Sequence, residues 1–333
     1  MPDATPTSIA PPSPARRNKR WRAAQIALGA IVLVYIGRAL TKNWRSFRAE
    51  SFDVHLTWSY LVASAAVVLL TYALLVDVWR RIVRAWGAEL GFVNAVRIWA
   101  VTNLGRYLPA GNLIQIAAMG DMARRVAVPP AAAIGSSLLS NLVAIPLGFA
   151  VGIAAGFRAM NDVSNGHRTL GIAVTFIVLA GVLALPVILP QLTAIAERIT
   201  GRSLQLGTLP MRAVYVAVIG NLVAWLLYGW AFQLLVHGVL GRSEGTLSDY
   251  VAAYALSYVM GYLVFLLPSG AGVREAAQIT VLTTLKLATS KEALLISVVS
   301  RLMMTILEVL PGLLFMATGT RFRPPRDGTL TKL

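Results

Sequence analysis

The chain alternates long apolar runs with short basic segments. The apolar runs cover about 23–40, 59–79, 130–157, 169–189, 211–237 and 290–317. A helix of about 20 apolar residues crosses the ~30 Å hydrocarbon core of a bilayer, and each run is close to that length. The runs lack the polar stripe of a surface helix, so they are expected to contact lipid or other helices on all sides. The pattern predicts an all-α polytopic integral membrane protein with about six to eight transmembrane helices.

Two further regions, 91–126 and 249–287, are apolar but interrupted. Each contains Leu-Pro-x-Gly, as LPAG at 108–111 and LPSG at 267–270. Proline removes a backbone donor and clashes with the preceding turn, and glycine permits conformations closed to other residues. Because the freed backbone groups must be buried in protein or face water, each break is expected to line a cavity. The helices are expected to restart near Asn112 and Val273, with their N-terminal amides directed into it.

The two breaks occupy equivalent places in two halves of the chain. Each follows an apolar run by about 30 residues and precedes the next by about 20. The matched spacing predicts an internal repeat, with halves at about 57–157 and 211–317, and paired interrupted segments of this kind indicate a site near the middle of the bilayer. Chance recurrence of a common loop tetrapeptide is the alternative. The sequence also leaves open whether 249–287 re-enters the membrane or crosses it twice.

Charge is sparse and mainly basic. The 333 residues are 57% hydrophobic and 13% charged, with net charge +16, whereas soluble domains carry about 25% charged residues. The basic residues lie between apolar runs, where membrane orientation and anionic headgroups select them, so no nucleic-acid partner is expected. With the Arg16–Arg22 cluster in the cytoplasm and both breaks re-entrant, most of the 30 Lys and Arg residues lie on the cytoplasmic side. This predicts an inner-membrane protein with a cytoplasmic N-terminus and inverted halves.

The predicted organisation is a single transmembrane domain at 23–320 between two tails. Residues 1–22 are expected to be a disordered, basic N-terminal tail, and 321–333 a cytoplasmic tail. A signal peptide is disfavoured, because the first apolar run is long and no small-x-small site follows before Thr41. The chain has no cysteine and three histidines far apart in sequence. We therefore expect neither a metal site nor another cofactor.

Charged residues inside the interrupted region and the last span are candidates for function. A charge at the bilayer centre costs roughly 2.5–3.5 kcal/mol on insertion scales, which is tolerated where it has a partner. For Arg274, substrate contact is favoured over snorkelling to the interface. Glu275 fits a helix cap and a site role equally, and a pairing of Arg301 with Glu275 is predicted as either structural or functional. Glu308 lies seven residues after Arg301, on the same helix face.

The first half supplies a second polar set around its break, which includes Asp121. Asn141 and Asn221 lie within spans and are expected to hydrogen-bond across helices rather than bind ligand. The candidate substrate-binding residues are Asn103, Arg106, Pro109, Gly111, Asn112, Gln115, Pro268, Gly270, Gly272, Arg274, Glu275 and Arg301.

Two stretches resemble a known family. TNLGRYLPAGN, followed by MARRVAVPPAAAIGSSLL, and LPSGAGVREAA are similar to the two signatures of the lysylphosphatidylglycerol synthase transmembrane-region family, also called flippase-like. The second signature, Pro-x-Gly-x-Gly-Val-Arg-Glu, matches in full, and an arginine in the last span, here Arg301, also fits. In the first signature Ala110 separates Pro109 from Gly111, where the family usually has glycine directly after proline.

The resemblance covers about residues 20–320 and implies inner-membrane proteins that move, or help to move, polar lipids between leaflets. The aminoacyl-transferase domain of the full-length synthases is expected to be absent, since only RFRPPRDGTLTKL follows the last span. The expected function is therefore that of a lipid translocator and not of an enzyme. Arg106, Arg274 and Arg301 would face a phosphate or other polar headgroup.

Two alternatives stay open beside the translocator. One is a membrane-embedded transferase that uses Glu275 as general base with Asp121 or Glu308. The other is an accessory subunit that positions enzymes of a lipid, glycolipid or hopanoid pathway. The sequence contains no nucleotide-binding motif, so transport would be driven by a gradient or run downhill.

Overall fold

The structure is a computed structural model that describes residues 56–108, 111–156, 165–184, 210–264 and 272–318, and residues 188, 191 and 270. These residues form nine α-helices and one 3-10 turn, without a strand, so the all-α prediction is confirmed. The elements are α2 (Trp58–Ala85), α3 (Phe92–Asn103), η1 (Leu104–Tyr107), α4 (Gly111–Arg124), α5 (Pro130–Gly156), α6 (Asn165–Leu183), α8 (Met211–Leu240), α9 (Leu247–Leu263), α10 (Val273–Thr284) and α11 (Ser290–Ala317). The predicted first span, 23–40, and both tails lie outside the described residues.

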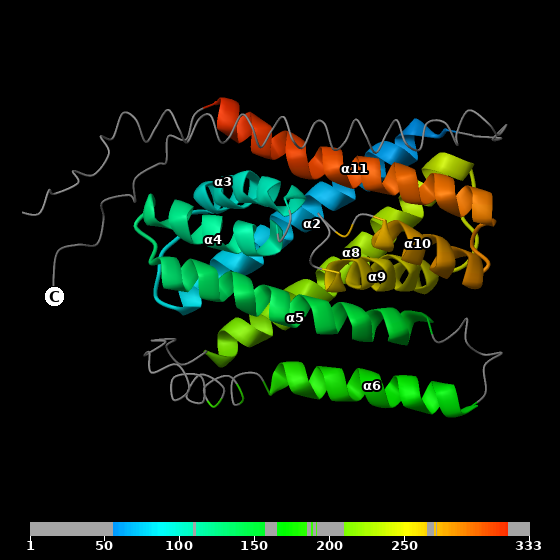
Figure 1. Cartoon of the computed structure of the whole chain (residues 1–333), viewed down its shortest axis with the longest axis horizontal. Helices are drawn as coiled ribbons and strands as arrows, with labels where there is room; N and C mark the ends of the chain where they lie inside the picture. Colours follow the sequence, from blue (N-terminus) through cyan, green and yellow to red (C-terminus); the bar gives the residue numbers. More distant parts are fainter. Residues whose placement is uncertain are drawn as a thin grey trace, which may run out of the picture.

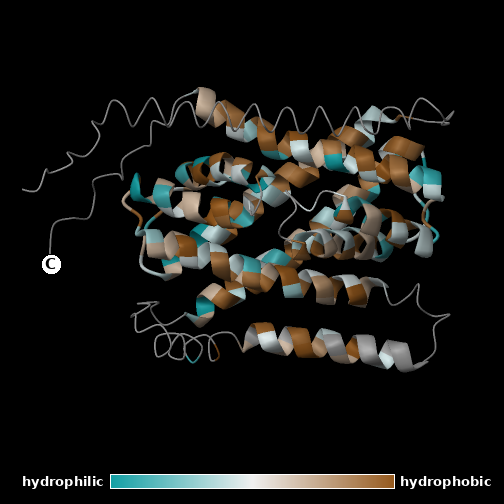
Figure 2. Cartoon of the chain, in the orientation of Figure 1, coloured by the Kyte–Doolittle hydropathy of each residue, from teal (hydrophilic) through white to brown (hydrophobic). Residues whose placement is uncertain are grey.

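Four of the described helices are long and apolar enough to cross a membrane: α2, α5, α8 and α11, with 27 to 30 residues each. At 1.5 Å per residue each is about 40 Å or more in length, which exceeds the hydrocarbon core. Figure 2 shows apolar residues along these helices and hydrophilic residues gathered at both ends of the bundle. The chain is a polytopic membrane protein. The predicted run 169–189 corresponds to α6, which ends at Leu183.

The two interrupted regions form helical hairpins. Helix α3 with η1 packs against α4, and α9 packs against α10. None of these helices exceeds 17 residues, or about 26 Å, which is below the ~30 Å thickness of the hydrocarbon core. In Figure 1 the α3–α4 hairpin lies beside the left half of the long helices, and the α9–α10 hairpin lies beside the right half. The interrupted ends of both hairpins lie at the centre. The two hairpins reach the centre from opposite ends of the bundle; that region 249–287 is re-entrant stays a prediction.

The connections between helices divide between the two ends of the bundle. Segments 86–91 and 125–129 lie at one end, and 241–246 and 285–289 lie at the other (Figure 1). The last turns of α2 and α4 and the first turn of α8 place several arginines at the first end. This is the grouping of basic residues that the sequence predicts; that this end is cytoplasmic stays a prediction.

Glycine permits the tight geometry of both breaks. Gly270 and Gly272 have φ of +66° and +88°, a region that side chains rarely adopt. At the start of α4, a Cβ on Gly111 would lie 2.5 Å from the Gly105 carbonyl oxygen, and α4 could not approach η1 as it does. Helices α4 and α10 begin at Gly111 and Val273, within one residue of the predicted positions.

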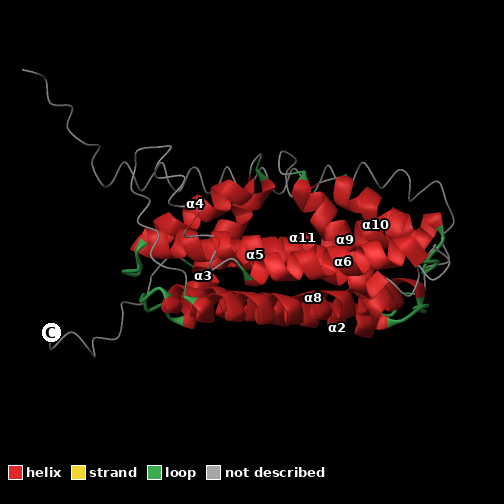
Figure 3. Ribbon diagram, turned by 90° about the horizontal axis from the view of Figure 1, so that it is seen from below, coloured by secondary structure: helices red, strands yellow, loops and turns green. Residues whose placement is uncertain are grey.

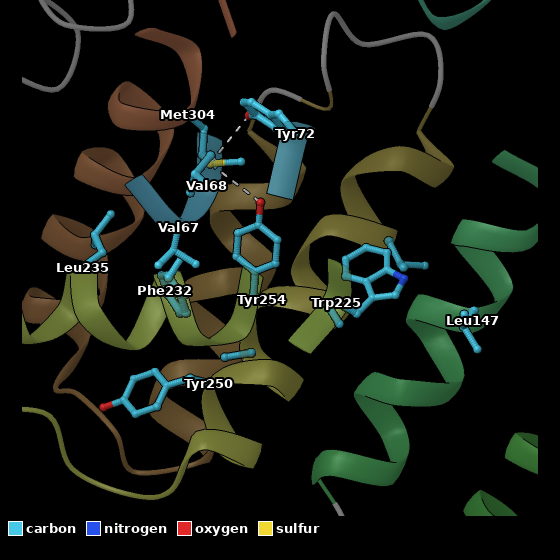
Figure 4. Packing of buried hydrophobic residues seen from close by; sticks show 14 of the residues in the cluster. Val67, Val68, Tyr72, Leu147, Trp225, Phe232, Leu235, Tyr250, Tyr254 and Met304 are labelled. Atoms are coloured by element: carbon cyan, nitrogen blue, oxygen red, sulfur yellow. Dashed lines mark hydrogen bonds between the residues drawn. The ribbon is translucent and has the colours of Figure 1, made fainter. Parts of the chain in front are cut away.

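Close packing of α2, α8 and α11 provides the frame for the hairpins. Helices α2 and α8 lie side by side along their length, on the side of the bundle away from α4 and α10 (Figure 3). The buried Ser64 hydroxyl of α2 donates a 2.6 Å hydrogen bond to the Ala231 carbonyl of α8. Met304 of α11 lies between the hydroxyls of Tyr72 and Tyr254, 4.0 and 3.8 Å from its sulfur (Figure 4). The contacts of Met304 join α2, α9 and α11 at one centre.

Candidate functional site

The tips of the two hairpins meet at a small cavity in the middle of the molecule, here called the cationic cavity. Its volume is about 30 Å³. Its charged lining residues come from three elements: Arg106 from η1, Arg274 from α10, and Arg301 and Glu308 from α11. Gly111 and Asn112 of the first break and Gly270 of the second also line it. The structure thus brings together residues from both breaks and the last span.

Arg274 is buried at this cavity, with 7% of its surface exposed. Its guanidinium carbon lies 5.1 Å from the ring centroid of Tyr254 and 5.0 Å from that of Tyr258. Both distances are within the range of cation–π attraction. Among the described residues its Nη2 atom has no hydrogen-bond partner. Arg274 therefore lies in the interior instead of snorkelling to the interface, and within the described part of the chain it keeps an unused donor.

Arg106 connects the first hairpin to the second hairpin and to α11. Its Nη2 atom donates a 2.6 Å hydrogen bond to the hydroxyl of Tyr258, and Nη1 donates to Oδ1 of Asn103 at 3.4 Å. Nη1 also lies 3.7 Å from Oε1 of Glu308. Its Nε atom is buried without a hydrogen-bond partner in the described part of the chain. Arg106 thus connects the first break to α9 and α11.

Glu308 is the acceptor at the centre of the same cluster. It is 7% exposed, and it accepts hydrogen bonds from the hydroxyls of Tyr72 at 3.2 Å and Tyr107 at 2.9 Å. With Arg106 nearby, three groups compensate this buried carboxylate, as a buried charge requires.

The predicted pairing of Arg301 with Glu275 is present. Nε of Arg301 lies 3.4 Å from Oε1 of Glu275. The other carboxylate oxygen, Oε2, accepts a 2.6 Å hydrogen bond from the amide of Gly272, which satisfies a donor at the start of α10. Glu275 thus caps its helix and pairs with α11 at the same time. Each carboxylate oxygen keeps a second lone pair beside these contacts.

The other predicted residues of the first break also assemble here. Nε2 of Gln115 donates to Oδ1 of Asn103 at 3.2 Å, and Asn112 lines the cationic cavity. Asp121 does not join them, because it lies two to three turns along α4, is exposed, and has Arg125 at 3.7 Å. Pro109 and Pro268 lie outside the described residues.

A second cavity of about 140 Å³, here called the neutral chamber, adjoins the first and shares Arg106, Asn112, Tyr258, Met304 and Glu308 with it. Asn141 of α5 and Asn221 of α8 line this chamber. The prediction that these two side chains form hydrogen bonds across helices is wrong. Nδ2 of Asn141 donates to the Ser137 carbonyl at 3.0 Å and Nδ2 of Asn221 to the Ala217 carbonyl at 2.8 Å. The carbonyl four residues back in the same helix is the nearest acceptor, and it holds each amide at the chamber wall.

Sequence reasoning missed the tyrosines of the site. Tyr72, Tyr107, Tyr254 and Tyr258 carry most of its hydrogen bonds and ring contacts. Tyr254 and Tyr258 are four residues apart in α9, which places both rings on one helix face, and this spacing was an available signal. In the part of the chain that is described, no three His, Asp or Glu side chains form a metal-binding group.

The model of one protein family, described as the lysylphosphatidylglycerol synthase TM region, matches residues 22–312. The chain belongs to the lysylphosphatidylglycerol synthase TM region family. No curated protein sequence gives a match. Membership in a family of membrane domains named for a lipid synthase supports a membrane role related to lipids.

In this member of the lysylphosphatidylglycerol synthase TM region family, the charges around the cationic cavity do not balance. Three arginines, Arg106, Arg274 and Arg301, face two carboxylates, Glu275 and Glu308. The first-turn amides of α4 at Gly111 and Asn112 add the positive end of a helix dipole. An excess of one positive charge, with unused arginine donors, suits an anion of one negative charge such as a phosphodiester.

Proposed function

We propose that this protein translocates a lipid with an anionic, phosphate-bearing headgroup between the leaflets of the membrane. The headgroup would enter the cationic cavity between the two hairpins, while the acyl chains stay in the bilayer. Membership in a lipid-related membrane family supports the lipid substrate. The two hairpins support movement between leaflets, because they reach one central site from opposite ends of the bundle.

The observation that carries the proposal is the state of Arg274. A guanidinium that is 93% buried is costly inside a membrane unless an acceptor compensates it. The rings of Tyr254 and Tyr258 supply part of this compensation, but they accept no directional hydrogen bond from Nη2. A phosphate oxygen is the acceptor that best matches the guanidinium fork. Arg106, which also has an unused buried donor, lines the same cavity.

Liposome reconstitution tests the proposal. The protein is inserted into vesicles that contain a fluorescent phosphatidylglycerol, and dithionite quenching of the outer leaflet measures the rate at which lipid exchanges. Charge-assisted hydrogen bonds contribute about 1.5–3 kcal/mol, so Arg274→Ala is expected to slow exchange by about tenfold or more. Arg274→Lys keeps the charge without the fork and should give an intermediate rate. Arg124→Ala removes an exposed arginine at the far end of α4 and serves as the matched control.

Equal exchange rates for the wild type and Arg274→Ala, with both proteins folded by circular dichroism, would overturn the assignment of this site. Exchange no faster than in protein-free vesicles, across lipids with several anionic headgroups, would overturn the function itself. Mass spectrometry of the recovered lipid tests the transferase alternative in the same samples. A covalent change that depends on Glu308, the carboxylate that lines both cavities, would favour it.

A further inference from the structure

The neutral chamber differs in chemistry from the cationic cavity beside it. Among the described residues, its charged lining consists of Arg106 and Glu308, whose Nη1 and Oε1 atoms lie 3.7 Å apart. The remaining polar lining consists of the amides of Asn112, Gln115, Asn141 and Asn221 and the hydroxyls of serines and tyrosines. A second ionic group in the chamber would have no free counter-charge, and its desolvation would be unfavourable.

The polar groups of the chamber keep unused hydrogen-bonding capacity. Asn141 and Asn221 each use Nδ2 on their own helix, which leaves both amide oxygens as acceptors. The side chain of Asn112 makes no hydrogen bond with any described residue, and the buried hydroxyl of Ser140 also has no partner there. Donors and acceptors are therefore mixed around one space, which suits hydroxyl groups because each hydroxyl both donates and accepts.

Aromatic rings form the other wall of the chamber. Tyr72 lies 5.0 Å from Trp99 and 6.3 Å from Tyr228, and Trp225 lies 6.2 Å from Tyr228 and 5.4 Å from Tyr258, measured between ring centroids. These five rings make a continuous series that comes from α2, α3, α8 and α9. The negative face of an aromatic ring attracts the weakly positive C–H groups on the face of a saturated ring.

The neutral chamber is lined by both aromatic rings and amides with unused hydrogen-bonding capacity. From this combination we propose that the headgroup carries an uncharged, hydroxyl-rich ring, a sugar or a cyclitol, next to its phosphate. The phosphate would lie at Arg274 and the ring in the neutral chamber, on the two sides of Arg106 and Asn112. This proposal rests on the proposed function and specifies its substrate class. A chamber of about 140 Å³ is close in volume to a cavity of roughly 150 Å³ that holds one benzene ring, so it has space for a single six-membered ring. It is too small for a long oligosaccharide.

Binding of short-chain lipids to the purified protein, measured by isothermal titration calorimetry, tests the proposal. Dioctanoyl phosphatidylinositol and dioctanoyl phosphatidylmethanol carry the same phosphodiester charge and differ in the ring. We expect phosphatidylinositol to bind at least about tenfold more tightly. Dioctanoyl lysyl-phosphatidylglycerol, which carries a lysyl ester with two amino groups instead of a ring, should bind more weakly than phosphatidylinositol. Free myo-inositol and inorganic phosphate distinguish a lipid headgroup from soluble ligands, and both should bind far more weakly.

Variants assign the effect to the chamber. Asn141→Leu and Asn221→Leu keep side-chain size and remove the amides, and each should reduce the preference for phosphatidylinositol without weakening phosphatidylmethanol. Thr280→Val is the matched control, because Thr280 also bonds the carbonyl four residues back in its own helix but is exposed on α10. Retained phosphatidylmethanol binding demonstrates that each variant is folded.

The outcomes separate this inference from the proposed function. Equal affinity for phosphatidylinositol and phosphatidylmethanol, or tighter binding of the lysyl lipid, overturns the ring site while the anionic lipid site stands. If free myo-inositol binds as tightly as the lipid, the claim that the ring is part of a lipid headgroup is overturned. If no phospholipid binds, the proposed function fails and this inference fails with it.

Discussion

The Arg106–Glu308 pair should make a measurable contribution to folding, because it joins the first hairpin to the last span in a buried place. The perturbation is a double-mutant cycle with Arg106→Gln and Glu308→Gln, which removes each charge and keeps a polar side chain at both positions. Tyr72 and Tyr107 donate to different oxygens of Glu308, and glutamine keeps only one of them. This loss is shared by the single variant Glu308→Gln and the double variant, so it cancels in the cycle. The cycle therefore isolates the interaction between the two charges from the hydrogen bonds around them.

The expected magnitude follows from distance and burial. Nη1 of Arg106 and Oε1 of Glu308 are 3.7 Å apart, and the side chains are 16% and 9% exposed. At that separation and an effective dielectric constant of about 20, Coulomb attraction is about 4.5 kcal/mol. The cavities on both sides of the pair weaken it through polar surroundings, so we expect a coupling of about 1–3 kcal/mol in the free energy of unfolding. Each single variant should lose more, because it leaves one buried charge without its partner.

The assay is reversible unfolding by dodecyl sulfate in mixed micelles, followed by circular dichroism of the helices. The pair Arg242–Glu292 is the control cycle. Its atoms are closer, at 2.8 Å, but its side chains are 48% and 23% exposed, so its coupling should stay below about 1 kcal/mol. A larger coupling for Arg242–Glu292 than for Arg106–Glu308 would refute the argument that burial, and not distance, sets the strength of these pairs.

Four further variants test local packing and helix capping. Gly312→Ala should destabilise the protein by about 1–3 kcal/mol, because the added Cβ would lie 2.6 Å from the Ala100 carbonyl oxygen of α3. In α6, a Cβ added at Gly181 would meet nothing within 4 Å, so Gly181→Ala should instead stabilise the protein slightly. Thermal denaturation in detergent measures both changes. Ser64→Ala removes the bond from α2 to α8 and should cost about 0.5–1.5 kcal/mol in the same assay, and an unchanged midpoint would contradict it. Thr289→Ala removes the hydroxyl that caps α11 and should cost about 0.5–2 kcal/mol, with faster hydrogen exchange confined to its first turn.

Much of the frame was predictable from the sequence because hydropathy and spacing act locally. The runs at 130–157 and 290–317 end within one residue of α5 and α11. The Leu-Pro-x-Gly breaks indicated where α4 and α10 begin, since proline and glycine interrupt a helix wherever they occur. The pairing of Arg301 with Glu275 was also predictable, because few charges lie in the apolar segments and each needs a partner.

The rest of the site was not predictable because its partners are far apart in sequence. The hydrogen bonds that Glu308 accepts from Tyr72 and Tyr107 cross 236 and 201 residues, and no periodicity connects positions so distant. Tyrosine in an apolar segment gives no signal by itself, since it is common in cores and at membrane interfaces. Asn141 and Asn221 were assigned to helix contacts on general grounds, and only the fold places them at one chamber.

The tryptophans of the neutral chamber have a practical consequence. Trp79, Trp99 and Trp225 line it, out of eight in the chain, and Nε1 of Trp225 already donates to the Ala144 carbonyl at 3.1 Å. An indole emits at a wavelength set by the polarity around it, so a ligand that displaces water from these rings should shift the emission of the unlabelled protein. The chain thus carries its own optical sensor of occupancy, suitable for screening lipids without dyes.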